Sequence, residues 1–147
     1  MRMMKEKYDL AGKVIGFAMR VHRELGAGFN EQVYKNSLII ELADAGFQFD
    51  VEKKIKVYYR EKIVGDFSAE IIVYEDDELI LELKAVQNLV SSHEVQLVNY
   101  LTATRINTGL LLNFGADSLQ FKRKFRQQSQ ACDPEPTTLQ SSYSYSG

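Results

Sequence analysis

Two acidic residues and a lysine fall where two neighbouring strands would bring them together. Glu82-Leu83-Lys84 ends one alternating apolar run, and Glu70 lies on the run before it. A hairpin centred on Asp76 would place Glu70 directly opposite Glu82, with facing side chains roughly 5 Å apart. Carboxylates that close repel each other unless a proton or a cation lies between them. With Lys84 on the same face, the group could hold a divalent metal beside a phosphate.

The chemistry that such a group could perform is phosphodiester hydrolysis. A metal lowers the pKa of a water and neutralises charge on the phosphate, and Mg²⁺ usually takes one or two carboxylates and keeps its other waters. Lys84 could orient the attacking water or stabilise developing charge. The alternative is a cross-strand Glu–Lys ladder on a solvated face. Ile72 and Ile80 flank the carboxylates, however, and indicate a partly covered face on which unpaired acids are costly.

Two helices could add polar groups to the same site. Glu31 falls in the first turn of one helix, on the stripe of Tyr34, and could hold the metal. Alternatively, the helix macrodipole alone could account for an acid at that position. Gln96 and Tyr100 are four residues apart and share a helix face, from which they could bind a phosphate or orient the lysine. Otherwise they are ordinary helix residues, with Tyr100 filling the core.

Hydrophobic periodicity predicts the elements that position these groups. Apolar residues recur at helical spacing over 5–25 and from Asn30, a plausible N-cap, to Gly46. A capping box with Ser91 as the cap and Glu94 three residues later predicts a third helix, ending near 104. Strands are expected at 49–59, around Glu70, around Glu82, at 108–114 and at 119–125. The order is helix, helix, three strands, helix, two strands: an α/β fold with a mixed central β-sheet flanked by helices.

Composition indicates one globular domain, residues 1–126, followed by a disordered low-complexity tail, residues 127–147. The tail is rich in Gln, Ser, Thr and Tyr and has almost no aliphatic residues with which to form a core. Two of the chain's 20 acids lie in these 21 residues, which have no Lys or Arg, so 18 acids face 18 bases in the domain. The domain is therefore not a uniformly basic nucleic-acid binder. A basic cluster at 122–126 fits either a solvated edge strand or phosphate contacts.

The sequence also carries information about the cellular location of the protein. No apolar run approaches the length of a membrane span, and the N-terminus has no signal-peptide stretch. Its one cysteine, Cys132, excludes an internal disulfide framework. A cytoplasmic protein with no membrane partner is the expectation.

Several separate motifs occur in a recognisable order along residues 8–125. They are Val21-His22, Leu25-Gly26, Gly28-Phe29, Glu31, Tyr34, Glu82-Leu83-Lys84-Ala85-Val86, His93, Gln96-Leu97, Asn99-Tyr100-Leu101 and Gly109-Leu110-Leu111-Leu112-Asn113-Phe114-Gly115. In these motifs the chain resembles the bacterial and archaeal "GxxExxY" proteins, which are placed in the PD-(D/E)XK nuclease-like superfamily. The resemblance implies the restriction-endonuclease-like core of that superfamily, a helix, three strands, a helix and a strand.

The resemblance also implies roles for individual residues. Glu82 and Lys84 would be the acid-x-lysine pair, with the Leu83 carbonyl between them as a further metal ligand, and Glu31 the additional helix carboxylate. Gln96 and Tyr100 match the Q-x-x-x-Y motif of RecB-type nucleases. The chain departs from the family at Glu70, where Asp is usual. Glutamate reaches one methylene further, and a displacement of about an ångström can cost on the order of 10²-fold in rate.

The sequence thus predicts a nuclease that uses Mg²⁺ or Mn²⁺ to hydrolyse phosphodiester bonds, with DNA as the expected substrate. Glu70 and Glu82 would hold the metal, assisted by Glu31, while Lys84 positions the water. One alternative is a catalytically weak or inactive module on the same fold that binds nucleic acid or protein. Another is a small assembly protein whose apolar surfaces pair chains. A homodimer large enough to span a duplex is also compatible with the sequence.

Overall fold

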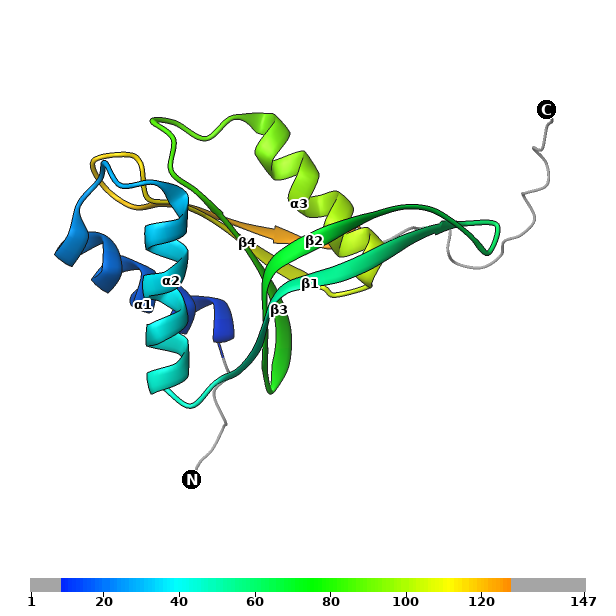
Figure 1. The fold of residues 1–147 in the computed structure, drawn as a ribbon, viewed down its shortest axis with the longest axis horizontal. Helices are drawn as coiled ribbons and strands as arrows, with labels where there is room; N and C mark the ends of the chain where they lie inside the picture. The colour runs from blue at the N-terminus through cyan, green and yellow to red at the C-terminus, as the bar shows by residue number, and fades with distance from the viewer. Residues whose placement is uncertain (1–8, 128–147) are drawn as a thin grey trace, which may run out of the picture.

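The computed structural model describes residues 9–127, which form a five-stranded mixed sheet with helices on both faces (Figure 1). The predicted fold class and the predicted order of elements are both confirmed. The elements are α1 (Leu10–Leu25), α2 (Glu31–Asp44), β1 (Gln48–Tyr59), β2 (Lys62–Glu75), β3 (Asp77–Lys84), α3 (Ser91–Thr104), β4 (Thr108–Asn113) and β5 (Gln120–Phe125).

The sheet has the strand order β1-β2-β3-β4-β5. Neighbouring strands are antiparallel except β3 and β4, which are parallel and are joined through α3. The strand β4 is almost wholly apolar and buried along most of its length, as expected for a strand covered on both faces. The strand order places β3 at the centre of the sheet, and its residues from Leu79 to Leu83 are buried, with Lys84 half-buried at its end.

Two hydrophobic cores lie on opposite faces of this sheet. Leu79, Leu81 and Leu83 pack in a core with α1 and α2, whereas Ile80 packs in a second core with α3. The alternation predicted for β3 is therefore confirmed. Since Glu82 and Lys84 follow Ile80 at a spacing of two, they extend the row that faces α3.

In β2 the predicted alternation fails at Glu70. A regular strand would place Ala69 and Ile71 on one face, but Ile71 packs in the core of α1 and α2 and Ala69 packs in the core of α3. The neighbouring strand is irregular at the same level, because Glu52 has a left-handed backbone with φ of 55°. Strand pairs are formed by Val51 with Ile71 and by Lys53 with Ala69. The break in alternation leaves Glu70 between the two cores.

Two helix starts differ from prediction, whereas the predicted Asn30 cap of α2 is confirmed, its Oδ1 accepting a hydrogen bond from Val33. The first helix begins at Leu10 with Asp9 as its N-cap, and residues 5–8 of the predicted helix lie outside the described region. The Ser91–Glu94 capping box is wrong. Val90 takes the cap position, and its N–H donates to His93 Nδ1 at 3.3 Å.

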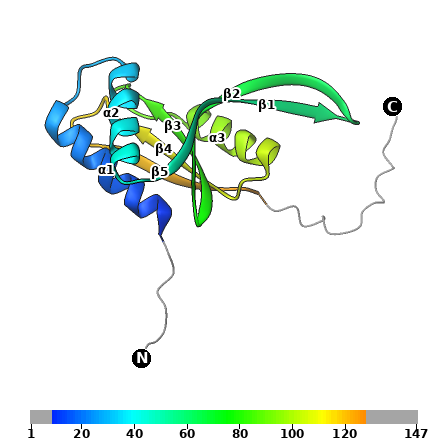
Figure 2. The ribbon, with the colours of Figure 1, turned by 60° about the horizontal axis from the view of Figure 1, so that its bottom comes forward.

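The β1–β2 hairpin extends as an arm beyond the rest of the sheet (Figures 1 and 2). Its turn consists of Arg60 and Glu61, both with positive φ, 52° and 68°. Two consecutive left-handed residues are typical of the tight turns whose twist matches that of paired strands. The arm leaves four large apolar side chains exposed: Tyr58, Tyr59, Ile63 and Val64.

Other predictions concern the chain beyond the core elements. The segment predicted to be a disordered tail, residues 127–147, lies outside the described region except for Gln127. Within residues 9–127, no helix is long and apolar enough to cross a membrane. The basic cluster lies on β5 at the sheet edge, where Arg123 pairs with Asp9 and Lys124 with Glu94. These contacts favour the edge-strand interpretation over phosphate binding.

Candidate active site

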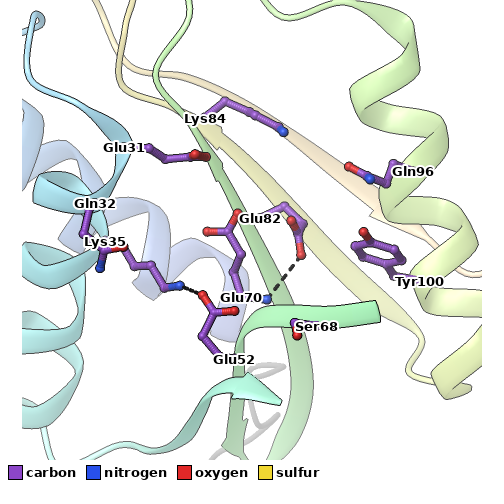
Figure 3. A pocket seen from close by; sticks show the side chains of 10 residues that line it. All are labelled: Glu31, Gln32, Lys35, Glu52, Ser68, Glu70, Glu82, Lys84, Gln96 and Tyr100. Atoms are coloured by element: carbon purple, nitrogen blue, oxygen red, sulfur yellow. Dashed lines mark hydrogen bonds and ion pairs between the residues drawn. The ribbon is translucent and has the colours of Figure 1, made fainter. Parts of the chain in front are cut away.

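A polar cavity of about 330 Å³ opens where α2, the sheet and α3 meet (Figure 3). It collects six of the seven side chains selected from the sequence, and Leu83, selected for its carbonyl, points its own side chain into the core on the other face. The lining residues are Glu31, Gln32, Lys35, Glu52, Ser68, Glu70, Glu82, Lys84, Gln96 and Tyr100. Residues far apart in sequence thus share one solvent-accessible hollow.

Glu70 and Glu82 lie next to each other at the base of this cavity. The β2–β3 ladder runs to Ile71 opposite Leu81, and the two glutamates are the next residues on each strand. The backbone N–H of Glu70 donates to Glu82 Oε2 at 3.4 Å. Glu82 is only 5% exposed, so its carboxylate is held away from bulk water. The predicted approach of the two acids is confirmed.

The environment of these two acids disfavours their charged forms. Burial raises the pKa of Glu82 to about 8, and the charge of Glu70 adds to the effect. Burial also raises the pKa of Glu70 to about 7, and the charge of Glu31 adds to it. Lys84 lowers both pKa values, but by less than burial raises them. Near neutral pH the pair therefore holds a proton unless another cation takes its place.

Glu31 is placed in the cavity by the loop between α1 and α2. Tyr34 anchors this loop, because its hydroxyl donates to the Gly26 carbonyl at 2.5 Å and accepts from the Phe29 N–H at 3.2 Å. The Tyr34 ring also stacks on Phe114, with centroids 4.8 Å apart. In the run from Gly28 to Tyr34, the tyrosine therefore anchors the loop, Gly28 supplies a positive φ of 117°, and Glu31 faces the cavity.

Glu31 has an oxygen with unused bonding capacity. Its Oε2 is buried and has no hydrogen-bond partner. A buried carboxylate oxygen without a partner is costly, and such exceptions call for an explanation, which an ion not included in the structure can supply. The predicted orientation of Glu31 toward the sheet is confirmed.

Lys84 is held by the backbone at the end of β3. The Phe114 N–H donates to the Lys84 carbonyl at 2.9 Å. Next to it, Asn113 is fully buried, and its Oδ1 accepts from the N–H groups of Val86 and Gly115 at 2.9 and 3.0 Å. This side chain ties the loop after β3 to the loop after β4. The lysine therefore projects into the cavity from a fixed strand end.

The α3 side of the cavity is formed by Gln96 and Tyr100, one helical turn apart. The Tyr100 ring stacks on Phe67 of β2, with centroids 3.8 Å apart and planes inclined by 6°. Burial raises the pKa of the Tyr100 hydroxyl, and the charges of Glu82 and Glu70 raise it further. Tyr100 thus combines a ring packed against the core of α3 with a place on the wall of the cavity that holds the acids, and its role toward a phosphate or Lys84 stays a prediction.

An ion pair between Lys35 and Glu52 also lines the cavity, and sequence reasoning missed both residues. Lys35 could have been found, because it lies one helical turn after Glu31 and must share its face. Its side chain is only 6% exposed. Glu52 could not have been found from the sequence, because the direction of its side chain depends on the left-handed backbone at that residue.

The donor set suits a hard cation, although the side chains do not yet surround one. Carboxylate oxygens are the ligands that Mg²⁺ prefers, and the raised pKa values of Glu70 and Glu82 and the unpaired Glu31 oxygen fit a cation among them. Within residues 9–127, however, no three His, Cys, Asp or Glu side chains are grouped closely enough to hold a metal ion. Glu70 and Glu82 would hold it, with Glu31 reaching it directly or through water.

Comparison with known proteins agrees with this arrangement. A family model described as the PD-(D/E)XK nuclease superfamily matches residues 8–126. The chain belongs to this superfamily.

A solved structure titled "Crystal structure of SSO0001" is similar in fold, with a TM-score of 0.53 and 16% sequence identity. The match covers 69% of this chain and 53% of that one, so the chain spans about half the length of the SSO0001 protein. A search of curated proteins gave no match.

Proposed function

We propose that this protein is a metal-dependent nuclease of the GxxExxY branch that hydrolyses phosphodiester bonds, with DNA as its substrate and Mg²⁺ or Mn²⁺ as its cofactor. The observation that supports this most strongly is the approach of Glu70 to Glu82 beside Lys84. A buried acid, Glu82, beside a half-buried one, Glu70, both with raised pKa values and with a lysine next to them, has no evident structural benefit. They do suit a site where a cation binds and where an anionic substrate follows.

The chain's own residues have separate tasks in this proposal. Glu70 and Glu82 would hold the cation, which would supply an activated water and neutralise phosphate charge. Glu31 would offer its unpaired oxygen to the same cation. Lys84 orients the water or stabilises the charge that develops on the phosphate. The Leu83 carbonyl, next to both site residues in the backbone, is proposed as a further ligand.

The helix α3 supplies the substrate side of the site. Gln96 and Tyr100 face the acids across the cavity (Figure 3). Both can donate hydrogen bonds, so they can contact a phosphate oxygen or fix the Lys84 ammonium group. A cytoplasmic location and a homodimer are part of the same proposal.

A second candidate function is binding without catalysis, in which the protein holds its ligand but does not cleave it. The described residues do not enclose a complete set of metal ligands, and Glu70 replaces the shorter aspartate. Such a module would bind nucleic acid or protein through the same face without cleaving it.

Cleavage and metal uptake together test these two proposals. Single-stranded DNA, duplex DNA and RNA are incubated with the full chain in Mg²⁺ and in Mn²⁺, and Mn²⁺ is titrated calorimetrically. Cleavage and binding heat in the wild type, both lost in Glu82→Gln, support the nuclease. Binding of nucleic acid without cleavage supports the module. Cleavage that persists in Glu82→Gln rejects the assignment of the site.

A further inference from the structure

A second cavity, of about 490 Å³, lies between the β1–β2 arm and α3. Tyr100 lines both this cavity and the acidic one, so the two hollows adjoin. Lys56, Tyr58 and Phe67 line it from the arm, and Arg105 lines it from the end of α3. A chain molecule bound at the acids would therefore reach this cavity by passing Tyr100.

The charges of the two cavities are opposite in character. The acidic cavity has four glutamates and two lysines on its walls, whereas the second has Lys56 and Arg105 and no acid. Within residues 9–127, neither of these cations forms an ion pair. Both are exposed and able to meet an anion. Lys56 and Arg105 suit the phosphates on either side of the phosphodiester bond that is cleaved, because the metal at the acids would not neutralise those phosphates.

Aromatic rings occupy the same walls. Phe67 and Tyr100 form a stacked pair, and Tyr58 is 60% exposed. The β1–β2 ladder shifts register between Val57 and Tyr58, with Val57 opposite Gly65 and Tyr58 opposite Ile63. A bulge of this kind redirects side chains, and both Val57 and Tyr58 line the cavity although they are adjacent in a strand.

Arg105 is also held in an unusual way. It ends α3 in the left-handed region, with φ of 63° and ψ of 20°. Glycine is the usual residue in that conformation, and another residue there is held at some cost in backbone energy. A role for the Arg105 side chain in the second cavity, which it lines, would account for this cost in backbone energy.

We propose that the second cavity binds a nucleotide of a single-stranded nucleic acid, next to the phosphate held at the acidic cavity. The proposal rests on the proposed function, whose substrate class it narrows. Tyr58 stacks on a base, while Lys56 and Arg105 contact the neighbouring phosphates. Stacked aromatic residues combined with a basic groove are typical of single-strand binding sites. Bases in a duplex have their faces covered by their neighbours, so they offer no ring face to Tyr58.

Fluorescence anisotropy with the full chain tests this inference. The probes are fluorescein-labelled oligodeoxythymidine and oligouridine in Ca²⁺, and a gel after each titration shows whether they are intact. Tyr58→Ala is expected to weaken binding roughly 5- to 150-fold, the effect of losing one base stack. Tyr58→Phe keeps the ring and should bind as the wild type does. Tyr59→Ala is the matched control, because Tyr59 is equally exposed at 62% but does not line the cavity.

Salt dependence tests the phosphate contact separately. Lys56→Ala should lower the slope of log K against log salt by about 0.7, the value for one phosphate on a single strand. Lys54→Ala is the control, because this exposed lysine of the same strand lies outside the cavity.

Several results would overturn the inference. The first is an equal loss of affinity in Tyr58→Ala and Tyr59→Ala, and the second is no binding by the wild type. The third is that unlabelled duplex DNA competes for binding as well as single-stranded DNA does. The fourth is that Tyr58→Ala changes only the oligomeric mass. The proposed nuclease is judged on other data. If the protein does not cleave but its binding depends on Tyr58, the nuclease proposal is rejected and the nucleotide site is supported. If it cleaves but its binding does not depend on Tyr58, the nuclease proposal is supported and the nucleotide site is rejected.

Discussion

Replacing Glu82 by glutamine should stabilise the metal-free protein at alkaline pH. The Glu82 carboxyl has a pKa of about 8 in the folded chain and an ordinary value of 4.5. Between these values the folded state keeps a proton that the unfolded state has released. The stability associated with this proton is fully present below pH 4.5 and is lost as the pH rises through about 8. Glutamine keeps the shape and has no such proton to lose.

The size of the effect follows from the same two pKa values. One pKa unit corresponds to about 1.4 kcal/mol, so ionising Glu82 weakens the folded state by at most about 5 kcal/mol. Its side chain is nearly buried, at 5% exposed, so solvent screens this cost little. We expect Glu82→Gln to be about 2–5 kcal/mol more stable than the wild type at pH 8.5 and nearly equal to it at pH 4.5. Glu70 keeps part of the pH dependence in the variant, because its pKa is also raised.

Urea unfolding in EDTA from pH 4.5 to 9 measures this difference. Glu78→Gln is the control, because Glu78 is an exposed residue of the same strand and should follow the wild-type curve. Adding Mn²⁺ at pH 8.5 should restore stability to the wild type but not to Glu82→Gln, since a ligand that binds only the folded state stabilises it. Parallel stability curves for the wild type and Glu82→Gln would show that the carboxylates are not a strained pair, and would refute the reasoning.

Three further changes have separate readouts. Lys84→Met should reduce cleavage about 10²–10³-fold while the heat of Mn²⁺ binding persists, because the lysine stabilises charge and does not bind the metal; loss of that heat would contradict this role. Lys35→Met should raise the pH midpoint of Mn²⁺ binding, because the Lys35 charge lowers the pKa of Glu70; a midpoint that stays or falls would show that the two charges do not interact. Gly115→Ala should unfold at lower denaturant, by roughly 1–3 kcal/mol or more, because its Cβ would lie 2.4 Å from the backbone N and O of Val86. Gly16→Ala, which meets nothing within 4 Å in an exposed part of α1, should instead stabilise by up to about 1 kcal/mol.

Local patterns in the sequence determined most of the fold. The helix periods, the alternation of β3, the Asn30 cap and the turn at Asp76 all concern residues close together in the chain, and the structure follows each of them. The register of the β2–β3 hairpin is also local, because a hairpin turn fixes which residues face each other. The approach of Glu70 to Glu82 could therefore be predicted before any tertiary contact was known.

The predictions that failed depended on partners from elsewhere in the chain. Glu94 was expected to close a capping box, but it pairs with Lys124 of β5 at 2.9 Å, and His93 takes the role at the helix start. The alternation of β2 breaks at Glu70, at the level where Glu52 of the neighbouring strand has a left-handed backbone. Neither event leaves a periodic signal in the sequence.

The chain by itself determined which groups can react, through residue types placed at strand and helix spacings. Only the tertiary structure decided that Glu82 is buried, that a Glu31 oxygen lacks a partner, and that Lys35 and Tyr58 line cavities beside the acids. Burial, solvation and the meeting of distant segments are properties of the packed chain, because each depends on atoms contributed by several elements at once. The pKa values of the acids follow from that packing, and spacing along the sequence cannot determine them.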